Sequence, residues 1–377
     1  MIPIAKPFFG PEEQQAACDA IASGWVTQGP RVAAFEEAFA AYCGAEHAVA
    51  VSSCTTALHL ALLTVGVEPG DEVICPSMSF IATANAIRHC GARPVFADVR
   101  ADDFNIDPDV IEPLIADKTK ALLPVHQLGM PAEMERIIQI ADAHGLAVVE
   151  DAACAIGSRY KGVTIGKPFG RSACFSFHPR KVITTGDGGM ITTDDEAIAG
   201  ELRLLRQHGM SVPDTVRHAA KTLVFESYVC VGYNYRMTDI QAAVGIEQLK
   251  RLDWIVTNRR RLAAVYNQAF ADLPGVLVPS PPADVEPNYQ SYAIRLTAEA
   301  GISRDDLMRR LLDRGVASRR GVMLAHREPA YAESCAEVHL PISEHVFGNS
   351  IILPLFPQMT DQDQMSVIHA VADALGR

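Results

Sequence analysis

A single lysine, Lys181, lies between a short apolar run and a glycine-rich turn. Phe175 and Phe177 predict a buried strand before the lysine, and the turn at residues 186–189 leads into a second strand. An amine held in such a place can reach a carbonyl group in a pocket, where desolvation lowers its pKa and makes it nucleophilic. Loop lysines are common, so this segment alone also fits an ordinary solvated lysine.

A small polar turn at residues 52–56 has residue types suited to a phosphate. It follows a short apolar strand and opens a helix, whose first backbone N–H groups have no partner within the helix. These donors and the helix dipole attract an anion, and Thr55 and Thr56 add hydroxyl groups. Ser176, five residues before Lys181, is a possible further ligand. Serine and threonine also cap ordinary helices, so the turn alone is a weak indication.

Two other residues, Asp151 and Phe80, suit an aromatic ring. Asp151 ends the apolar run A-V-V-E, where a carboxylate can hold a protonated pyridine nitrogen, and Phe80 follows a strand, where it could stack on the ring. Taken singly, they fit a turn aspartate and a core phenylalanine equally well or better. A phosphate turn, an acid, an aromatic side chain and a lysine together indicate pyridoxal 5′-phosphate, with Lys181 forming the Schiff base.

Strands and helices alternate through the first part of the chain, after two helices at about residues 11–23 and 31–42. We expect strands at 47–52, 72–75, 94–98, 121–126 and 146–150, and helices at 57–65, 80–90, 108–116 and 132–144. This alternation predicts an α/β fold with a mostly parallel sheet covered by helices on both faces. Ligands of such sheets bind beyond the carboxyl ends of the strands, where the residues named above fall.

The rest of the chain predicts a second, smaller unit. Two short strands at about 155–160 and 173–177 and a third at 190–193 precede a helix at 195–207 and an irregular segment at 209–231. A long helix begins at 238–239 and continues with breaks toward 271, and a proline-rich connector follows at 274–287. Strands at 292–296 and 315–318 and helices at 304–314 and 361–375 complete the pattern. We therefore expect a large α/β domain at 1–250, N-terminal arm included, and a small α+β domain at 251–377.

Composition excludes several classes of protein. The 377 residues carry a net charge of −12, which makes nucleic acid an unlikely partner. The nine cysteines are scattered without a C-x-x-C pair, which is typical of reduced core thiols and not of a disulfide framework or a zinc site. We see no signal peptide and no apolar stretch near the roughly 20 residues that span a bilayer, so we expect a cytoplasmic protein without a membrane partner.

The chain resembles the DegT/DnrJ/EryC1/StrS family of nucleotide-sugar aminotransferases over nearly its full length. The matching motifs are G-W-V-T-Q-G-P (24–30), V-S-S-C-T-T-A-L-H (51–59), G-D-E-V-I-C-P-S (70–77), F-I-A-T-A-N-A-I (80–87), P-V-H-Q-L-G-M-P-A (124–132), V-V-E-D-A-A (148–153), F-S-F-H-P-R-K (175–181), T-G-D-G-G-M (185–190), R-Q-H-G (206–209), G-Y-N-Y-R-M-T-D-I-Q-A-A (232–243) and L-P-L-F-P-Q-M-T (353–360). So many motifs in the same order make the resemblance highly specific.

The resemblance implies the aspartate aminotransferase type I fold, pyridoxal 5′-phosphate and a homodimer with shared active sites. Its residue roles are implied as follows: Lys181 for the Schiff base and proton transfer, Asp151 for the ring nitrogen, Thr55, Thr56 and Ser176 for the phosphate, Phe80 for ring stacking, and Asn234 for the phosphate of the neighbouring subunit. Two cysteines depart from the family pattern. Cys54 replaces a common glycine, and Cys154 replaces the glutamine or histidine that many members place beside the cofactor hydroxyl.

The presence of Lys181 favours transamination, because a few relatives with histidine there act as sugar dehydratases. The resemblance implies that L-glutamate gives the amino group and leaves as 2-oxoglutarate, and that a keto-sugar of a nucleoside diphosphate receives it. The N-terminal motifs favour a 4-keto-6-deoxy sugar over a 3-keto sugar. Candidate substrate-binding residues are Thr27, Gln28, Gly29, His178, Arg236, Arg319, Arg320 and His326.

Two other classes of function were weighed. A nicotinamide-dependent oxidoreductase would need G-x-G-x-x-G in the first strand-to-helix turn, where this chain has S-S-C-T-T. A non-catalytic regulatory protein that binds pyridoxal 5′-phosphate on this scaffold is disfavoured by the intact lysine and aspartate.

Overall fold

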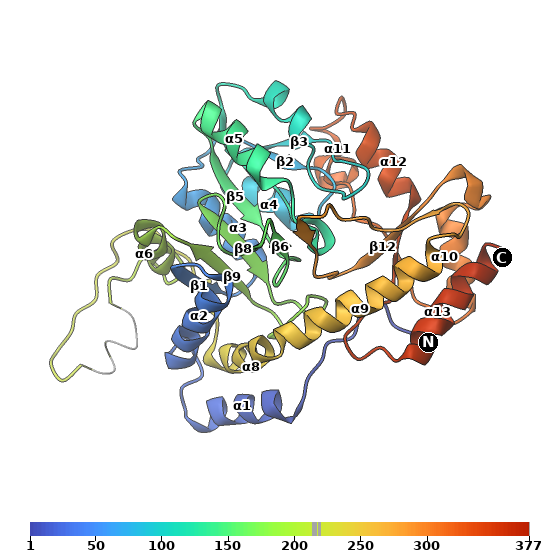
Figure 1. The fold of residues 1–377 in the computed structure, drawn as a ribbon. Coiled ribbons are helices and arrows are strands. Elements are labelled where there is room, and N and C mark those ends of the chain that lie inside the picture. Colours follow the sequence, from blue (N-terminus) through green and yellow to red (C-terminus); the bar gives the residue numbers. More distant parts are fainter. Residues whose placement is uncertain (213–216, 218–219, 377) are drawn as a thin grey trace.

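The computed structural model describes residues 1–212, 217 and 220–376, and its centre is a seven-stranded sheet with helices on both faces (Figure 1). The strand order is β1-β9-β8-β5-β4-β2-β3. The strands are β1 (His47–Val51), β2 (Glu72–Pro76), β3 (Arg93–Ala97), β4 (Thr119–Leu122), β5 (Ala147–Asp151), β8 (Ser172–Ser176) and β9 (Gly189–Thr193). The predicted parallel α/β sheet is confirmed.

Helices form two layers around this sheet. One layer contains α3 (Cys54–Thr64), α4 (Ala82–His89) and α6 (Glu196–Leu205). The other contains α2 (Pro30–Cys43), α5 (Met134–His144), α8 (Asp239–Lys250) and the first part of α9 (Leu252–Phe270), while α1 (Pro11–Ala22) packs outside on α8.

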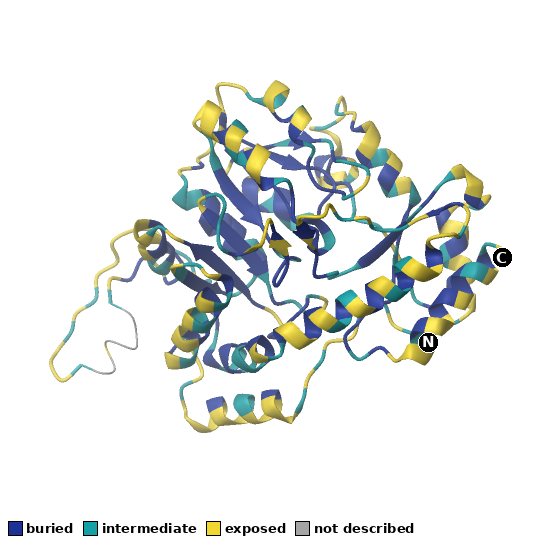
Figure 2. Cartoon of the chain, in the orientation of Figure 1, coloured by how far each residue is buried: buried dark blue, intermediate teal, exposed yellow. Residues whose placement is uncertain are grey.

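Alternate residues of each strand enter opposite cores, as the twofold repeat of a strand requires. In β1, Ala48 and Ala50 pack with the α2 layer, whereas Val49 and Val51 pack with the α3 layer. The central strands are therefore buried on both faces, as Figure 2 shows, and most of their buried residues are apolar.

Most of the strands bring their carboxyl ends to one edge of the sheet. Every neighbouring pair among β8, β5, β4, β2 and β3 is parallel. Strand β9 is antiparallel to both β1 and β8, so it begins at this same edge, and its first residue, Gly189, pairs with Val51 on one side and Ser176 on the other. The turn after β1 and the end of β8 thus meet at Gly189.

Only glycine fits at position 189. A Cβ atom there would lie 2.5 Å from the carbonyl carbon and oxygen of Ser53 and 2.7 Å from the backbone nitrogen of Cys54. This close approach sets the spacing between β9 and the turn that opens α3.

The C-terminal part has its own four-stranded sheet, in the order β10-β12-β14-β13. It comprises β10 (Val276–Leu277), β12 (Tyr292–Leu296), β13 (Arg319–Arg320) and β14 (Ser350–Leu353), with α10 (Arg304–Asp313), α12 (Pro341–Asn349) and α13 (Asp361–Ala374) around it. The short helix α11 (Pro329–Ala332) instead packs on the large domain, where Tyr331 contacts Phe96 of β3. The expected division at residue 251 falls at the start of α9, which crosses between the two parts: Ile255 packs in the large core and Tyr266 in the small one. Ile2 of the N-terminal arm pairs with Val316 of the C-terminal part.

Three predicted elements are wrong in type or place. Residues 108–116, expected as one helix, form two 3-10 turns, Pro108–Val110 and Glu112–Leu114, because Pro113 interrupts the helical hydrogen bonds. The strand expected at 155–160 is only β6 (Arg159–Tyr160), which lies in a separate small sheet with β7 (Val163–Thr164) and β11 (Val285–Glu286). The strand expected at 315–318 is β13, at 319–320.

Further predictions concern the long helix, the irregular segment, the cysteines, and membrane spans and metal sites. The long helix from residue 239 is confirmed, with its break at Arg251 between α8 and α9. Residues 213–216 and 218–219 of the irregular segment are outside the described residues. All nine cysteines are free thiols. In the described part of the chain, no helix is long and apolar enough to cross a membrane, and no cluster of acidic, histidine or cysteine side chains could hold a metal ion.

The steric constraint at Gly189 is testable. We expect Gly189→Ala to lower the free energy of unfolding by about 1–3 kcal/mol, as overpacking usually does, and to weaken cofactor binding because the turn at Ser53 must move. The matched control is Gly200→Ala in α6, where a Cβ meets nothing within 4 Å and the helix should gain up to about 1 kcal/mol. Denaturant unfolding measures both; equal stabilities would contradict the packing argument.

Candidate active site

Lys181 lies in the loop between β8 and β9, at the carboxyl edge of the sheet. Its Nζ donates a hydrogen bond to Sγ of Cys154 at 3.1 Å, and its backbone N–H donates to the carbonyl oxygen of His178 at 2.8 Å. Burial acts to lower the pKa of the Lys181 amine, but Cys154, followed by Cys54 and Asp151, outweighs it and the pKa lies above the ordinary lysine value. The expectation of a desolvated lysine with a lowered pKa is therefore wrong for the protein without cofactor.

Asp151 ends β5 and is only 4% exposed. Its Oδ2 accepts a hydrogen bond from the hydroxyl of Thr83 at 2.7 Å, and its Oδ1 accepts one from the backbone N–H of Ala153 at 3.1 Å. Because a carboxylate only accepts, Thr83 must donate, and its oxygen is left to accept from Ser79, 2.7 Å away. These donors favour the charged form of a buried carboxylate.

Thr83 and Ser79 were missed by the sequence analysis. Both are buried, on the segment that leads from β2 into α4. Thr83 is three residues after Phe80, and a hydroxyl in the first turn of a helix that begins at the carboxyl edge was the available signal.

A second buried pair lies directly behind Asp151. Nε2 of His126 lies 3.1 Å from Oε2 of Glu150, and neither side chain is exposed. The backbone N–H of Ala132 donates to Nδ1 of His126 at 3.0 Å, so the ring proton is on Nε2 and points to Glu150. The other oxygen of Glu150 accepts from the backbone N–H groups of Phe169 and Gly170. Every oxygen of this carboxylate is thus satisfied within the protein.

The turn after β1 has the geometry of a helix N-terminus. Ser53 is the N-cap of α3, and its hydroxyl accepts from the backbone N–H of Thr56 at 3.2 Å. The hydroxyl of Thr56 in turn donates to the carbonyl oxygen of Ser53 at 2.8 Å. Within the described chain, the hydroxyl of Thr55 has no hydrogen-bond partner, and the N–H groups of Cys54 and Thr55 belong to the first turn and have none within the helix.

The group of Cys54 that is suited to a bound anion is its backbone N–H and not its thiol. Burial, and next the charge of Asp151, raise the pKa of the Cys54 thiol well above its usual value, so this group stays neutral. Its N–H remains at the helix N-terminus, where glycine stands in many relatives.

The Phe80 ring is 62% exposed at the end of the β2 segment. This exposure excludes the alternative reading of a core phenylalanine and leaves the ring face available to a planar ligand at the same edge as Asp151.

Loop 24–29 and the segment at 234–236 lie together beyond β1. The amide of Gln28 donates to Oε1 of Gln207 at 3.4 Å, and Gln207 forms a backbone bridge with Asn234. Arg236 forms a similar bridge with Val51, immediately before the phosphate-type turn. The carbonyl oxygen of Thr27 accepts from the N–H of Asp239, at the start of α8. Asn234 and Thr27 are exposed.

The remaining predicted substrate residues are not equally available. His326 is 2% exposed, with Nδ1 2.6 Å from the Ser77 hydroxyl and Nε2 3.3 Å from Glu344, so both ring nitrogens are engaged and burial lowers its pKa. His178 accepts at Nδ1 from the N–H of Arg180 and is partly exposed. Arg319 lies exposed in β13 of the small sheet.

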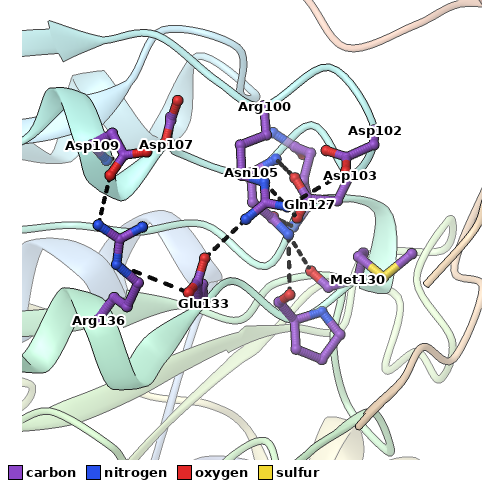
Figure 3. Close-up of polar contacts among 11 residues, drawn as sticks. Arg100, Asp102, Asp103, Asn105, Asp107, Asp109, Gln127, Met130, Glu133 and Arg136 are labelled. Carbon is purple, nitrogen blue, oxygen red and sulfur yellow. Dashed lines mark hydrogen bonds and ion pairs between the residues drawn. The ribbon is translucent and has the colours of Figure 1, made fainter. Parts of the chain in front are cut away.

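The loop after β4 is tied to its neighbours by the buried Asn105, shown in Figure 3. Its amide donates to the carbonyl oxygens of Met130 and Pro131, and its Oδ1 accepts from the N–H of Gln127 at 2.8 Å. The Gln127 side chain donates to the carbonyl oxygen of Met78, in the loop after β2. Adjacent strand ends are thus joined directly.

The residues that this edge brings together fit pyridoxal 5′-phosphate. Cys54, Thr55 and Ser176 offer unpaired or accessible donors for a phosphate beside the close contact at Gly189. Asp151 offers a buried carboxyl group, held by two hydrogen-bond donors, for a ring nitrogen. An amine that reaches a carbonyl completes the set of groups this cofactor needs.

The chain is similar to known proteins over nearly its whole length. Residues 8–372 match the DegT/DnrJ/EryC1/StrS aminotransferase family. The spore coat polysaccharide biosynthesis protein SpsC of Bacillus subtilis is 40% identical over 99% of this chain and 96% of that protein. The crystal structure of S. venezuelae DesV, in complex with a ketimine intermediate, is 36% identical over 100% and 99% of the two chains, with a TM-score of 0.90. Streptococcus pneumoniae Spr1654, solved in PLP-form and PMP-form, is 29% identical, with TM-scores of 0.90 and 0.91 over the whole of this chain and 98% and 99% of that one.

The hydrogen bond from Thr83 to Asp151 leads to a direct prediction. Thr83→Val removes one of two donors to a buried charge, a loss of about 1.5–3 kcal/mol, so we expect pyridoxal 5′-phosphate to bind roughly 10-fold or more weakly. Thr83→Ser should bind nearly normally because it keeps the hydroxyl. Absorbance titration measures the dissociation constants. The control is Thr64→Val, whose hydroxyl donates only to the carbonyl of Ala61 in α3; wild-type affinity in Thr83→Val would show that Asp151 does not need this donor.

Proposed function

The chain belongs to the DegT/DnrJ/EryC1/StrS aminotransferase family and is a pyridoxal 5′-phosphate-dependent sugar aminotransferase, and we propose that it moves the amino group of L-glutamate onto a keto-sugar of a nucleoside diphosphate. We further propose a 4-keto-6-deoxy sugar as the acceptor. The product would serve the biosynthesis of a surface polysaccharide, a glycan or a natural product. The SpsC relative is a protein of spore coat polysaccharide biosynthesis, and this supports the assignment.

The observation on which the proposal depends is the placement of Lys181, Asp151 and the turn at 53–56 along one edge of the sheet. The cofactor, when bound, supplies an electron-withdrawing ring that stabilises negative charge on the substrate carbon. Asp151 holds the ring nitrogen in its protonated form, and the backbone N–H groups at the start of α3 hold the phosphate.

Lys181 has two tasks in this proposal. Its Nζ would hold the cofactor between turnovers, and the amine would transfer the proton that leaves the α carbon of glutamate and the proton that reaches the sugar carbon. An amine on a loop between two anchored strands can do both, because its long side chain swings while its backbone stays fixed.

Arg236 is our preferred residue for the diphosphate of the substrate. It adjoins the end of β1, and within the described chain it forms no ion pair, so its charge is free to meet an anion. Thr27, Gln28 and Gly29 lie near the same end and are proposed to contact the sugar. The contacts of His326 leave it no ring nitrogen for a ligand.

We propose that two copies of the chain form a homodimer with shared sites. The segment after α6 extends away from the body of the molecule (Figure 1) and holds strongly exposed apolar side chains: Leu223 at 88%, Phe225 at 84% and Val231 at 91%. Exposed apolar surface of this size favours a protein partner. The exposed Asn234 follows this segment, so a second copy that covers the segment would bring Asn234 close to another subunit.

The substrate assignment can be tested with purified enzyme. We expect a yellow protein whose absorbance band changes on addition of L-glutamate, followed by amination of a 4-keto-6-deoxy nucleotide sugar identified by NMR of the product. Lys181→Ala should lower turnover by several orders of magnitude, since both proton transfers lose their acid–base group. Amination of only 3-keto sugars would overturn the assigned position, and amination of no nucleotide sugar would overturn the substrate class.

The shared site can be tested by mixing inactive variants. Lys181→Ala and Asn234→Ala homodimers should each retain little activity. When their subunits exchange at a 1:1 ratio, about half of the dimers are mixed, and each mixed dimer has one site with both native residues. Recovery of about a quarter of wild-type activity is expected; no recovery, with exchange verified by mass, would show that Asn234 acts within its own subunit.

A further inference from the structure

We propose that Cys154 is a positioning residue for Lys181, and that its sulfur orients the amine and favours the ammonium form of the amine. The inference rests on the assigned role of Lys181 as the lysine that bonds to the cofactor. It concerns the capture of pyridoxal 5′-phosphate and not the identity of the sugar.

The contact itself is specific. Nζ of Lys181 lies 3.1 Å from Sγ of Cys154, within the usual range for a hydrogen bond to sulfur, and no other side chain of the described chain forms a hydrogen bond or ion pair with this amine. Cys154 is partly exposed, whereas Cys75 and Cys174 of the central sheet are fully buried. Cys154 is therefore not one of the core thiols.

The position of Cys154 is imposed through its backbone. The amide nitrogen of Asn288 donates to the carbonyl oxygens of Cys154 and Ile156, each at 2.8 Å, and Asn288 is completely buried. The backbone N–H of Asn288 donates to the hydroxyl of Ser158 at 3.0 Å. Gly129 leaves room for this side chain, since a Cβ at that position would lie 1.9 Å from Oδ1 of Asn288.

The same segment also holds the lysine loop. The side chain of Gln290 donates to the carbonyl oxygen of Arg180 at 2.7 Å, one residue before Lys181. Arg259, 2% exposed in α9, donates to the carbonyl oxygens of Tyr289 and Gln290 at 3.1 Å. Residues 288–290 thus hold the backbone beside both side chains. The fold itself therefore brings the thiol of Cys154 and the amine of Lys181 together.

The surroundings of Lys181 determine how readily its amine becomes neutral. Three ionisable groups face Lys181: Cys154, Cys54 at the start of α3 and Asp151 at the end of β5. Burial acts to lower the pKa of the amine, and the contact with Cys154 is the largest of the influences that raise it. Without Cys154, the effect of burial would dominate and the pKa of the Lys181 amine would fall. The neutral amine would then form at lower pH.

The test measures how fast the cofactor-free protein captures pyridoxal 5′-phosphate as a function of pH, from the growth of the bound-cofactor absorbance band. Capture needs the neutral amine, so the rate should rise with pH. In Cys154→Ala the midpoint should move to lower pH and the plateau rate should fall, because the contact that favours the ammonium form and orients the amine is lost. In Cys154→Ser the midpoint should also fall, but the plateau should stay near that of the wild type, since a hydroxyl still accepts the hydrogen bond.

Cys335→Ser is the matched control, because Cys335 is also a partly exposed thiol and has no contact with Lys181. It should capture the cofactor as the wild type does. Wild-type midpoints and plateaus in both Cys154 variants would overturn the proposal. If Lys181→Ala still forms the normal cofactor band, the assignment of Lys181 fails instead, so the two failures are distinguishable.

A chemical readout tests the pair without cofactor. An ammonium beside a sulfur favours the thiolate, the form that iodoacetamide alkylates. Peptide mass spectrometry should show that alkylation of Cys154 slows in Lys181→Met, while alkylation of Cys335 is unchanged. Equal rates at Cys154 in both proteins would show that the amine and thiol do not act as a pair.

Discussion

A buried carboxylate at the middle of the sheet edge is the constraint on which the rest of the site depends. Asp151 has almost no contact with water, and a carboxyl group buried in this way needs hydrogen-bond donors, which Thr83 and the N–H of Ala153 provide. Thr83 must in turn stay at the start of α4, and Ser79 must stay within reach of Thr83. The hydrogen bonds that satisfy Asp151 therefore constrain the relative positions of β5, the loop after β2 and α4.

The residue before Asp151 also needs hydrogen-bond donors, on the opposite face of the sheet. Glu150, the preceding residue, points to the opposite face and is satisfied by His126 and two backbone N–H groups. Adjacent acidic residues on a strand must face opposite sides, and each side needs its own donors. The apolar layers on both faces exclude water, which strengthens these interactions and makes an unpaired group costly.

The two parts of the chain meet at Lys181. Gly189 joins the phosphate-type turn to β8, while residues 288–290 reach in from the connector to hold Cys154 and the backbone at Arg180. Arg259 holds that connector segment from α9, which spans both cores. Residues 288–290 thus hold the site by hydrogen bonds to backbone carbonyl groups. The residues of the site itself lie on the large sheet.

The sequence by itself determined the alternation of strands and helices, the carboxyl-edge location of the site and the set of Lys181, Asp151, Phe80 and the turn at 52–56. These follow from local patterns: apolar runs, helix starts and motif spacing are properties of neighbouring residues. Tertiary structure alone decided the Lys181–Cys154 contact, the support of Asp151 by Thr83 and the engagement of His326 by Ser77 and Glu344. It also decided the short 3-10 turns at 108–114, where Pro113 prevailed over helical periodicity. Contacts between residues distant in sequence, such as that of Asn288 with Cys154, leave no local pattern because packing creates them.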